Sequence, residues 1–381
     1  MELLQKFKDV LENRHTYATK WKERAGSKVI GYYDTYFPEE LVYAAGVLPV
    51  RVLPRHEPDD VTDRLMYGNC YYTRDMFNNF IRGHYDYVDG IVCVEGCQWL
   101  YNAFDTTMQV RPELFSHYMF VPDFVDGRRS KDLMLSEMKI FKGRLEGWLD
   151  KEIIDSALDK AIAVYNEHRQ LLRNLYELRR FDCPCLLGSE AMDVVLACQI
   201  MDKEDANRML KELIPALQER EPSEDRIRLM LLGSETFDSN LERLIESLGG
   251  NVVIDELENG VGYFINDVAP LKNRLMAIGL RYLGKPHSAL KDSVWRRRPD
   301  QIYRLYEDYQ AEGVIIAKQI YCHPHGTDMY TVWKLLRERD IPFYTFERDT
   351  TLPIQDTTLG IEALIETIRP AVVRLEGWSK A

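Results

Sequence analysis

Three cysteines lie where their thiols could bind a metal. Cys97 follows an apolar stretch at 90–94, Cys322 follows another at 314–317, and Cys70 precedes a helical pattern. If the two stretches are parallel strands, ligands collect beyond their carboxyl ends. The amide groups at a helix start favour a thiolate at Cys70. Three thiolates that meet in a cleft between domains could hold a 4Fe-4S cluster and leave one iron without a protein thiolate.

Spacing alone leaves other interpretations of these cysteines open. A catalytic zinc site has three protein ligands and a water, and His323 or His325 could supply a nitrogen. The chain has no CxxC pair that would separate zinc from iron–sulfur. The cysteines could also be buried structural residues, which is a common role for free cysteine.

The sequence around the other cysteines favours a role in packing. Cys93 lies inside an apolar strand pattern and Cys198 inside an apolar helical pattern. The pair Cys183 and Cys185, separated by a proline, fits a loop between helices, and a ligand pair for a second metal centre is the alternative. Seven cysteines in a long intracellular chain are not expected to form disulfides.

Candidate catalytic acids and bases lie close to the proposed ligands. Glu95 precedes Cys97 by two residues, and His323 and His325 flank Pro324 directly after Cys322. Histidine titrates near neutral pH, so these two side chains could supply protons, although a loop histidine is usually solvated.

Three further glutamates follow predicted strands. Glu39 and Glu40 open a predicted helix after the first strand, and Glu235 has the equivalent place after the strand at 227–232. Favourable charge at a helix N-terminus is the first interpretation of all three, and a catalytic acid or base at the ligand-binding edge of the sheet is the alternative. Gly233-Ser234-Glu235 matches no nucleotide-binding fingerprint, and no GxSxG nucleophile elbow is present.

Composition limits the classes of partner. The net charge is −12 with acids and bases interspersed, which argues against nucleic acid as a partner. The one basic cluster, 296–298, is interpreted as a solvated patch, with a CoA phosphate site as the alternative. A charged N-terminus and the lack of an apolar run of about 20 residues predict a cytoplasmic protein with no signal peptide and no membrane partner.

The arrangement of predicted elements indicates an α/β protein. Strands are expected at 28–33, 48–53 and 90–94, with a further apolar run at 118–121 and helices between them. A second α/β unit begins at 227 and includes strands at 251–254, 314–317 and 342–346, and a closing helix at 361–368. We therefore predict two doubly wound, Rossmann-like parallel sheets with additional helices. The expected domains are 1–130, a helical segment at 131–224, and 225–381.

The chain resembles the 2-hydroxyacyl-CoA dehydratase and benzoyl-CoA reductase superfamily along nearly its whole length. Each motif is modest, but their order and spacing together are specific. The motifs are the opening strand with its PEE helix and AAG-x-LP turn (28–33 and 37–50), the second-cysteine block (85–92 with Cys97), a helical segment (188–191 and 201–207), and the third-cysteine block (312–317 with Tyr321 and Cys322).

The resemblance implies that Cys70, Cys97 and Cys322 hold one 4Fe-4S cluster per chain. It also implies anaerobic acyl-CoA chemistry. The segment 13–22 favours the smaller, N-type or C-type, catalytic subunit of ATP-dependent benzoyl-CoA reductase. That enzyme reduces an aromatic acyl-CoA ring by single low-potential electrons. Glu95, His323 and His325 are then the candidate proton donors.

The same resemblance implies several partners. These are an acyl-CoA substrate such as benzoyl-CoA, a homologous second subunit, a separate ATPase iron–sulfur component that delivers electrons, and ferredoxin upstream of it. The alternatives are a subunit of an (R)-2-hydroxyacyl-CoA dehydratase, which is a lyase, and a non-catalytic relay subunit. A double-cubane cluster is a further alternative and would need about six thiolates.

The chain departs from the family pattern at one late segment and at two residues beside the cysteines. Residues 357–362 read Thr-Thr-Leu-Gly-Ile-Glu where the family has an Arg-rich segment. Where the second and third cysteines are often followed by Asp, this chain has Gln98 and His323. Changed neighbours alter the charge and hydrogen bonding around the sulfurs, which tune a cluster's potential. The acyl group that the enzyme uses is therefore left open by the sequence.

Overall fold

The structure is a computed structural model. It describes residues 2–55, 66–125, 127–180, 184–222, 226–285, 289, 291, 298–348 and 355–379, and in the last segment the side chains of 357–369.

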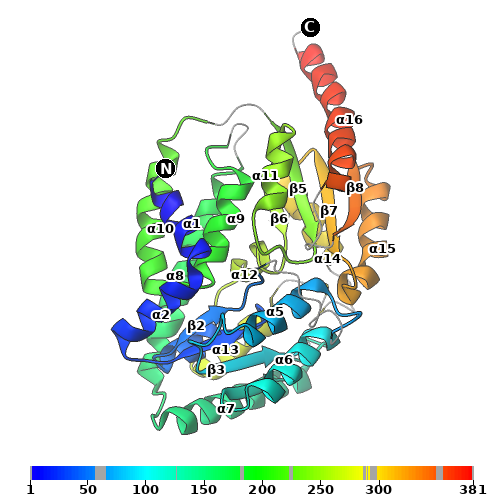
Figure 1. The fold of residues 1–381 in the computed structure, drawn as a ribbon. Coiled ribbons are helices and arrows are strands. Elements are labelled where there is room, and N and C mark those ends of the chain that lie inside the picture. Colours follow the sequence, from blue (N-terminus) through cyan, green and yellow to red (C-terminus); the bar gives the residue numbers. More distant parts are fainter. Residues whose placement is uncertain are drawn as a thin grey trace.

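Two separate four-stranded sheets form the framework, and all their strand pairs are parallel (Figure 1). The two doubly wound sheets predicted from the sequence are confirmed. In sheet order, the first consists of β2 (Leu48–Arg51), β1 (Val29–Tyr32), β3 (Gly90–Val94) and β4 (Phe115–Met119). The second consists of β6 (Gly250–Glu256), β5 (Ile227–Gly233), β7 (Gly313–Gln319) and β8 (Phe343–Arg348).

Helices cover the sheets and form a layer beside them (Figure 1). Those of the first half are α1 (Glu2–Glu12), α2 (Arg14–Ala25), α3 (Glu39–Ala44), α5 (Tyr71–Ile81), α6 (Gln98–Val110), α7 (Arg128–Leu149) and α8 (Asp155–Glu177). Those of the second half are α9 (Gly188–Cys198), α10 (Lys203–Gln218), α11 (Asn240–Ser247), α12 (Val261–Phe264), α13 (Arg274–Leu283), α14 (Arg298–Asp308), α15 (His323–Glu338) and α16 (Gln355–Ser379).

The first sheet is covered on both faces, which explains its almost continuous apolar strands. Successive side chains point to opposite faces, so Ile30 and Val92 join a core with α7, α8 and α13, whereas Val29 and Ile91 join a core with α5 and α6. Both cores are buried. The sheet is thus held as a rigid platform whose strand ends can carry a site.

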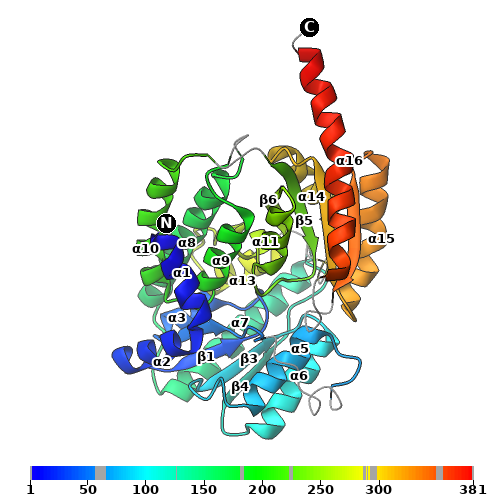
Figure 2. The ribbon, with the colours of Figure 1, turned by 45° about the horizontal axis from the view of Figure 1, so that its top comes forward.

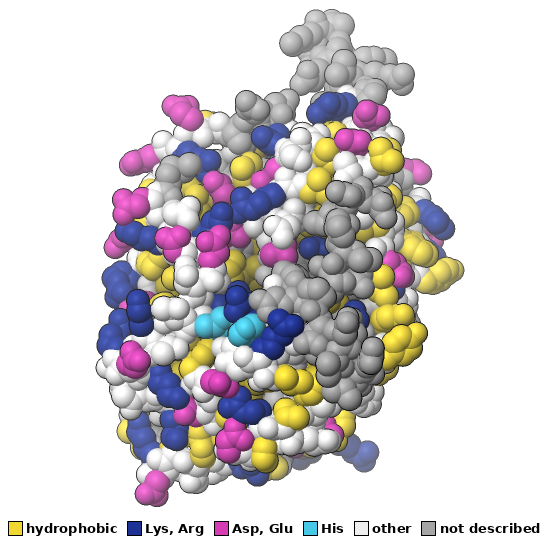
Figure 3. All heavy atoms as spheres, in the orientation of Figure 1, with side chains coloured by type: hydrophobic (Ala, Val, Ile, Leu, Met, Phe, Trp, Pro, Cys, Tyr) yellow, Lys and Arg dark blue, Asp and Glu magenta, His cyan; other side chains and the backbone are white. Residues whose placement is uncertain are grey.

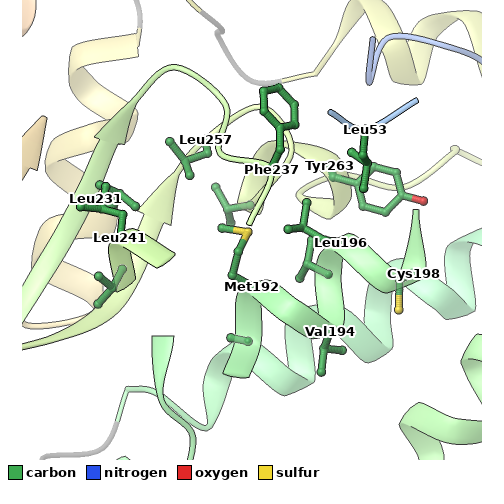
Figure 4. Packing of buried hydrophobic residues seen from close by; sticks show 14 of the residues in the cluster. Leu53, Met192, Val194, Leu196, Cys198, Leu231, Phe237, Leu241, Leu257 and Tyr263 are labelled. Carbon is green, nitrogen blue, oxygen red and sulfur yellow. The ribbon is translucent and has the colours of Figure 1, made fainter. Parts of the chain in front are cut away.

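Helix α9 connects the two sheets through one continuous core. Figure 4 shows Met192 and Leu196 of α9 pointing toward Phe237 and Leu257, which follow β5 and β6. Leu53, from the segment after β2, belongs to the same cluster. The residues between the sheets are therefore packed, and the two strand-end regions are held in one arrangement.

The chain returns to the first sheet late in the sequence. Ala277 and Ile278 of α13 are buried with Met134 and Met138 of α7, against the first sheet. The last helix, α16, extends beyond the body of the molecule (Figure 2). The domain boundaries at 130 and 224 stay a prediction. Helix α13, which belongs to the expected domain 225–381, packs in the same core as the first sheet.

Two local expectations were wrong. The apolar run at 118–121 lies only partly in a strand, because β4 spans Phe115–Met119 and its pairing with β3 begins at Gly90 and Phe115. His323 and His325 are not in a loop: α15 begins at His323, with Pro324 in the first turn, where proline is favoured.

The surface fits the charge pattern of the sequence. On the face shown in Figure 3, basic and acidic side chains are interspersed and form no broad basic region. Among the helices that the structure describes, none is both long and apolar enough to cross a membrane.

Candidate functional site

The fold brings Cys70, Cys97 and Cys322 together in one pocket. Each of them is the N-cap residue of a helix: Cys70 of α5, Cys97 of α6 and Cys322 of α15. Two helices belong to the first sheet and one to the second. The convergence of these residues in a cleft between two α/β units is therefore a product of the tertiary fold.

The carboxyl ends of both sheets supply the walls of this pocket, called here the cysteine pocket. Its volume is about 540 Å³, open solvent included. The residues lining it are Asp34, Cys70, Tyr72, Thr73, Cys97, Trp99, Leu100, Ser234, Glu235, Phe237, Glu258, Gln319, Cys322, His323, Pro324 and His325. Most of them follow strands β1, β3, β5, β6 and β7, as expected for a ligand site in parallel sheets, while Gln319 ends β7 and Cys70, Tyr72 and Thr73 lie at the start of α5.

The helix N-termini direct amide groups at the sulfurs. Backbone amides of Leu100 and Trp99 act to lower the pKa of Cys97, and those of Thr73 and Tyr72 do so for Cys70. Exposed N–H groups and the helix dipole both stabilise negative charge at this position. Three helices pointing at one place make a site that suits anionic sulfur.

Burial and mutual repulsion nevertheless oppose ionisation of the thiols in the protein alone. Burial raises the pKa of Cys97 to about 12, and Cys70 and Cys322 contribute to this rise by their own charge. Burial likewise raises the pKa of Cys70 to about 11, again with a contribution from Cys322. A positively charged metal core removes this cost because coordinated thiols are deprotonated. Three cysteines are the kind of donor set that an iron–sulfur cluster uses.

The spacing of the ligands bears on which kind of metal centre would fit. Across the described segments of the chain, no three His, Cys, Asp or Glu side chains are placed to hold a single metal ion. The Sγ of Cys322 and the Nδ1 of His325 are 3.3 Å apart, but they form only a pair. A four-iron cluster places each thiolate on a different iron, so its ligands stand further apart than those of one zinc ion.

The two histidines differ sharply in environment. His325 is 6% exposed, and its pKa is lowered to about 3, mainly by burial and further by Arg298 and Lys318. It is thus neutral at pH 7 and a partner for the Cys322 sulfur. His323 is exposed, and its ring centroid is 5.2 Å from that of Trp99 at the pocket opening.

Glu95 does not line the cysteine pocket. Its carboxyl group is partly buried on another side of the β3 end, where burial raises its pKa, Lys291 opposes this shift and Asp123 adds to it. Its Oε2 is enclosed without a hydrogen-bond partner among the described residues.

Three carboxyl groups line the pocket that the sequence analysis did not place there together: Asp34, Glu235 and Glu258. Arg51, at the end of β2, donates from Nη2 to Oε2 of Glu235 over 2.6 Å. Lys285 donates to Oε2 of Glu258 over 3.0 Å. A strand-end position was the available sequence signal for Glu235, whereas nothing in the sequence pattern indicated its partner Arg51.

Glu39 and Glu40 lie outside the cysteine pocket and are each held by cations. Lys203 forms an ion pair of 3.0 Å with Oε2 of Glu39, and Tyr32 donates to its Oε1 over 3.0 Å. Arg169 forms an ion pair with Glu40. They are buried interior residues rather than charges on a solvated helix start.

The other singled-out cysteines lie away from the site. Cys93 and Cys198 are buried in the apolar core. Cys185 is half-buried beside a separate cavity at the ends of α8 and α10, and Cys183 lies outside the described residues.

The expected solvated patch at 296–298 is wrong for its last residue. Arg298 is 3% exposed and donates from Nη2 to Oε2 of Glu256 over 2.6 Å, and it also pairs with Asp328. Its charge is compensated in the interior, which is the arrangement a buried guanidinium requires. The other two arginines lie outside the described residues.

Comparisons with known proteins point to one family. The family model described as "2-hydroxyglutaryl-CoA dehydratase, D-component" matches residues 34–368. The (R)-phenyllactyl-CoA dehydratase beta subunit of Clostridium sporogenes is 24% identical, over 95% of this chain and 97% of the relative. One of the benzoyl-CoA reductase subunits of Thauera aromatica is 25% identical, over 87% and 88% of the two chains. The (R)-2-hydroxyglutaryl-CoA dehydratase beta subunit of Acidaminococcus fermentans is 24% identical, over 96% and 99%.

Proposed function

Since the chain belongs to the 2-hydroxyglutaryl-CoA dehydratase D-component family, we propose that it is an iron–sulfur subunit of an enzyme that acts on acyl-CoA thioesters. The observation that carries the proposal is the meeting of Cys70, Cys97 and Cys322 at three helix N-termini in one pocket. These thiolates would hold a 4Fe-4S cluster. A bound cluster supplies single electrons at low potential, down to roughly −700 mV.

Reduction of an aromatic acyl-CoA is the reaction we propose. It is supported by the sequence motifs and by similarity to the benzoyl-CoA reductase of Thauera aromatica. Dehydration of a 2-hydroxyacyl-CoA is a second candidate, favoured by the name of the family model and by two of the three relatives. A relay subunit without a substrate of its own is the third.

The chain's own residues have distinct tasks in this proposal. The cysteines bind the cluster, and the amides of α5, α6 and α15 stabilise the sulfur charge. His325, neutral and bonded to Cys322, fixes that ligand's orientation. Trp99 and His323, whose rings are in contact near the opening, narrow the access of water to the pocket.

Partners complete the proposed enzyme. The relatives are named as subunits, which supports a second subunit beside this chain. The sequence contains no P-loop, so ATP hydrolysis belongs to a separate iron–sulfur component, with ferredoxin as its electron source.

Anaerobic purification with iron and sulfide counting tests the cofactor. We expect four irons per chain and a paramagnetic signal after reduction. Eight irons would instead support a double-cubane cluster, and absence of iron after anaerobic reconstitution would refute the proposal.

Product analysis tests the reaction. The reconstituted complex is supplied with a low-potential reductant and either benzoyl-CoA or a 2-hydroxyacyl-CoA. A dienoyl-CoA product supports the reductase, an enoyl-CoA product supports the dehydratase, and full iron content with neither product supports the relay.

A further inference from the structure

We propose that the ion pair between Arg51 and Glu235 positions the three cysteines, because it fixes how far Cys322 stands from Cys70 and Cys97. Arg51 ends β2 in the first sheet and Glu235 follows β5 in the second, so the pair joins the two sheets beside the cysteine pocket. This inference rests on the proposed function, in which the three cysteines are metal ligands.

The separation of the two sheets matters because the cysteines are divided between them. Cys70 and Cys97 start helices of the first sheet, whereas Cys322 starts a helix that follows β7 of the second. A metal core needs its thiolates at fixed places, and the groups around the ligands hold them there. A link between the sheets therefore controls the one part of the ligand geometry that neither sheet fixes alone.

Arg51 is tied to the helix that Cys70 starts. Its Nε donates to the hydroxyl oxygen of Tyr72 over 3.4 Å, and Tyr72 lies two residues after Cys70 in the first turn of α5. The same hydroxyl group is 2.8 Å from the carbonyl oxygen of Tyr33 and 3.0 Å from that of Val52, which follow β1 and β2. The guanidinium group and the start of α5 are thus held on the same strand ends.

Glu235 is tied to the turn that ends at Cys322. The Nε2 of Gln319 donates to the carbonyl oxygen of Glu235 over 2.9 Å, and the backbone N–H of Gln319 donates to Oγ of Ser234 over 3.0 Å. The backbone N–H of Cys322 in turn donates to the carbonyl oxygen of Gln319 over 3.0 Å. A displacement of Glu235 is therefore passed to Cys322 through Gln319.

The ion pair connects these two groups of residues. Nη2 of Arg51 donates to Oε2 of Glu235 over 2.6 Å, with exposed side-chain fractions of 1% and 15%. Beside it, the ring of Tyr72 stacks on that of Phe237, with ring centroids 4.1 Å apart. A charge-assisted hydrogen bond is short and directional, and salt screens a buried pair only weakly. The pair therefore sets a definite distance between the sheets at this point.

A second link crosses between the sheets at the pocket opening. Nε1 of Trp99, two residues after Cys97, donates over 3.2 Å to the carbonyl oxygen of Tyr321, which directly precedes Cys322. This bond is exposed and neutral, so water competes for both of its groups. We therefore expect the buried ion pair to contribute more to the positions of the thiols.

Cross-linking of the thiols tests the proposal without a metal. The full-length chain, reduced and free of iron, is treated with dibromobimane, which joins two neighbouring thiols, and the joined peptides are identified by mass spectrometry. In the wild type we expect products of Cys97 with Cys322, between the sheets, and of Cys70 with Cys97, within the first. In Glu235→Ala the ratio of the first product to the second should fall about fivefold or more. An unchanged ratio, or no Cys322 product in the wild type, would overturn the proposal.

Glu40→Ala is the matched control. It also breaks a buried pair of glutamate and arginine, but that pair joins α3 to α8 and neither helix carries one of the three cysteines. The ratio should stay within about twofold of the wild type, because the two sites share no partner. An equal fall in Glu40→Ala would mean that general loss of stability separates the thiols, and the positioning role would be lost.

Two arginine variants keep the test decisive if Glu235→Ala does not fold by circular dichroism. Arg51→Lys keeps the positive charge but lacks the planar fork that contacts both Tyr72 and Glu235, so the ratio should fall here too. Arg51→Met combined with Glu235→Ala should lower the ratio no further than Arg51→Met alone, because the two residues act as a pair. Additive effects, or a wild-type ratio in Arg51→Lys, would contradict the proposal.

The iron-loaded chain gives a second measurement. A chelator should remove iron from Glu235→Ala about tenfold faster than from the wild type, since the groups that hold the ligands are changed, and at the wild-type rate from Glu40→Ala. Equal rates in Glu235→Ala and the wild type would count against the ion pair. Absence of iron from the wild type would instead refute the proposed function, and the cross-linking ratio would still decide whether the pair positions the thiols.

Discussion

Two glutamates in corresponding places of the two sheets have opposite environments. Glu40 lies beyond β1 and Glu235 beyond β5, and each strand is second in its sheet. Glu40 pairs with Arg169 and accepts a hydrogen bond of 2.8 Å from Tyr282. Glu235 has Arg51 as its one cation partner among the described residues and shares its pocket with two further carboxyl groups.

The balance of charge around the two glutamates shifts their pKa values in opposite directions. Burial raises the pKa of Glu40, but Arg169, Arg281 and hydrogen bonds to the carboxylate together outweigh it, and the net shift is downward. At Glu235 burial prevails and the pKa rises. The same residue type, at the same edge of the same kind of sheet, therefore has its pKa lowered in one region and raised in the other.

The cysteines of the two regions provide the largest expected contrast. Cys97→Ala should remove nearly all iron from the anaerobically purified chain, because a ligand to the proposed cluster is lost. Cys198→Ala should keep its iron, because Cys198 is buried in the apolar core, where its carbonyl accepts a hydrogen bond from Lys203, the ion-pair partner of Glu39. Iron counting and circular dichroism of both variants check this. Full iron content in Cys97→Ala would remove Cys97 from the site.

Glu40→Gln should destabilise the fold by about 3–5 kcal/mol, because Arg169 is left buried without its anion. Glu235→Gln should destabilise the fold less than Glu40→Gln at pH 6, because burial raises the pKa of Glu235 to about 7 whereas the pKa of Glu40 is lowered. Urea unfolding at pH 6 measures both. Equal losses of unfolding free energy in the two variants would mean that the two carboxyl groups have the same charge at pH 6.

Glu242 extends the comparison to a buried glutamate whose two carboxyl oxygens have no hydrogen-bond partner among the described residues. Its folded-state pKa, about 8, is above the value of 4.5 for a free glutamate. The folded state therefore binds the proton more tightly, and this group reduces stability as pH rises from about 4.5 to about 8. Glu242→Gln should gain stability relative to the wild type between pH 5 and pH 8, by at most about 1.4 kcal/mol per pH unit. The measurement is the free energy of unfolding of the variant and the wild type at pH 5 and at pH 8. An equal difference between the two proteins at both pH values would contradict this prediction.

The smallest effect is expected at an exposed ion pair. Lys160 and Glu204 form a pair of 2.8 Å with exposed fractions of 62% and 52%. Lys160→Ala should change the free energy of unfolding by no more than about 0.5 kcal/mol, because water screens exposed charges. A loss comparable to that of Glu40→Gln would show that burial is not what separates strong from weak pairs here.

Local sequence patterns were sufficient to predict most helices and strands of this fold. Apolar runs at 90–94 and 227–232 predicted β3 and β5, because buried parallel strands need apolar side chains on both faces. The start of α15 was missed, because a histidine–proline–histidine segment looks like a loop until the first turn is seen. The run at 118–121 was misplaced, because strand ends depend on pairing with a neighbour.

The sequence by itself determined two parallel sheets, the family motifs and three cysteines at places where thiols could act, because periodicity and spacing are local properties of a chain. Only the tertiary structure decided which groups meet. It placed Glu95 outside the cysteine pocket, paired Glu40 with Arg169, and brought Arg51 to Glu235 across the two sheets. A carboxyl group's role depends on the charges within a few ångströms of it, and residues far apart in the sequence supply those charges.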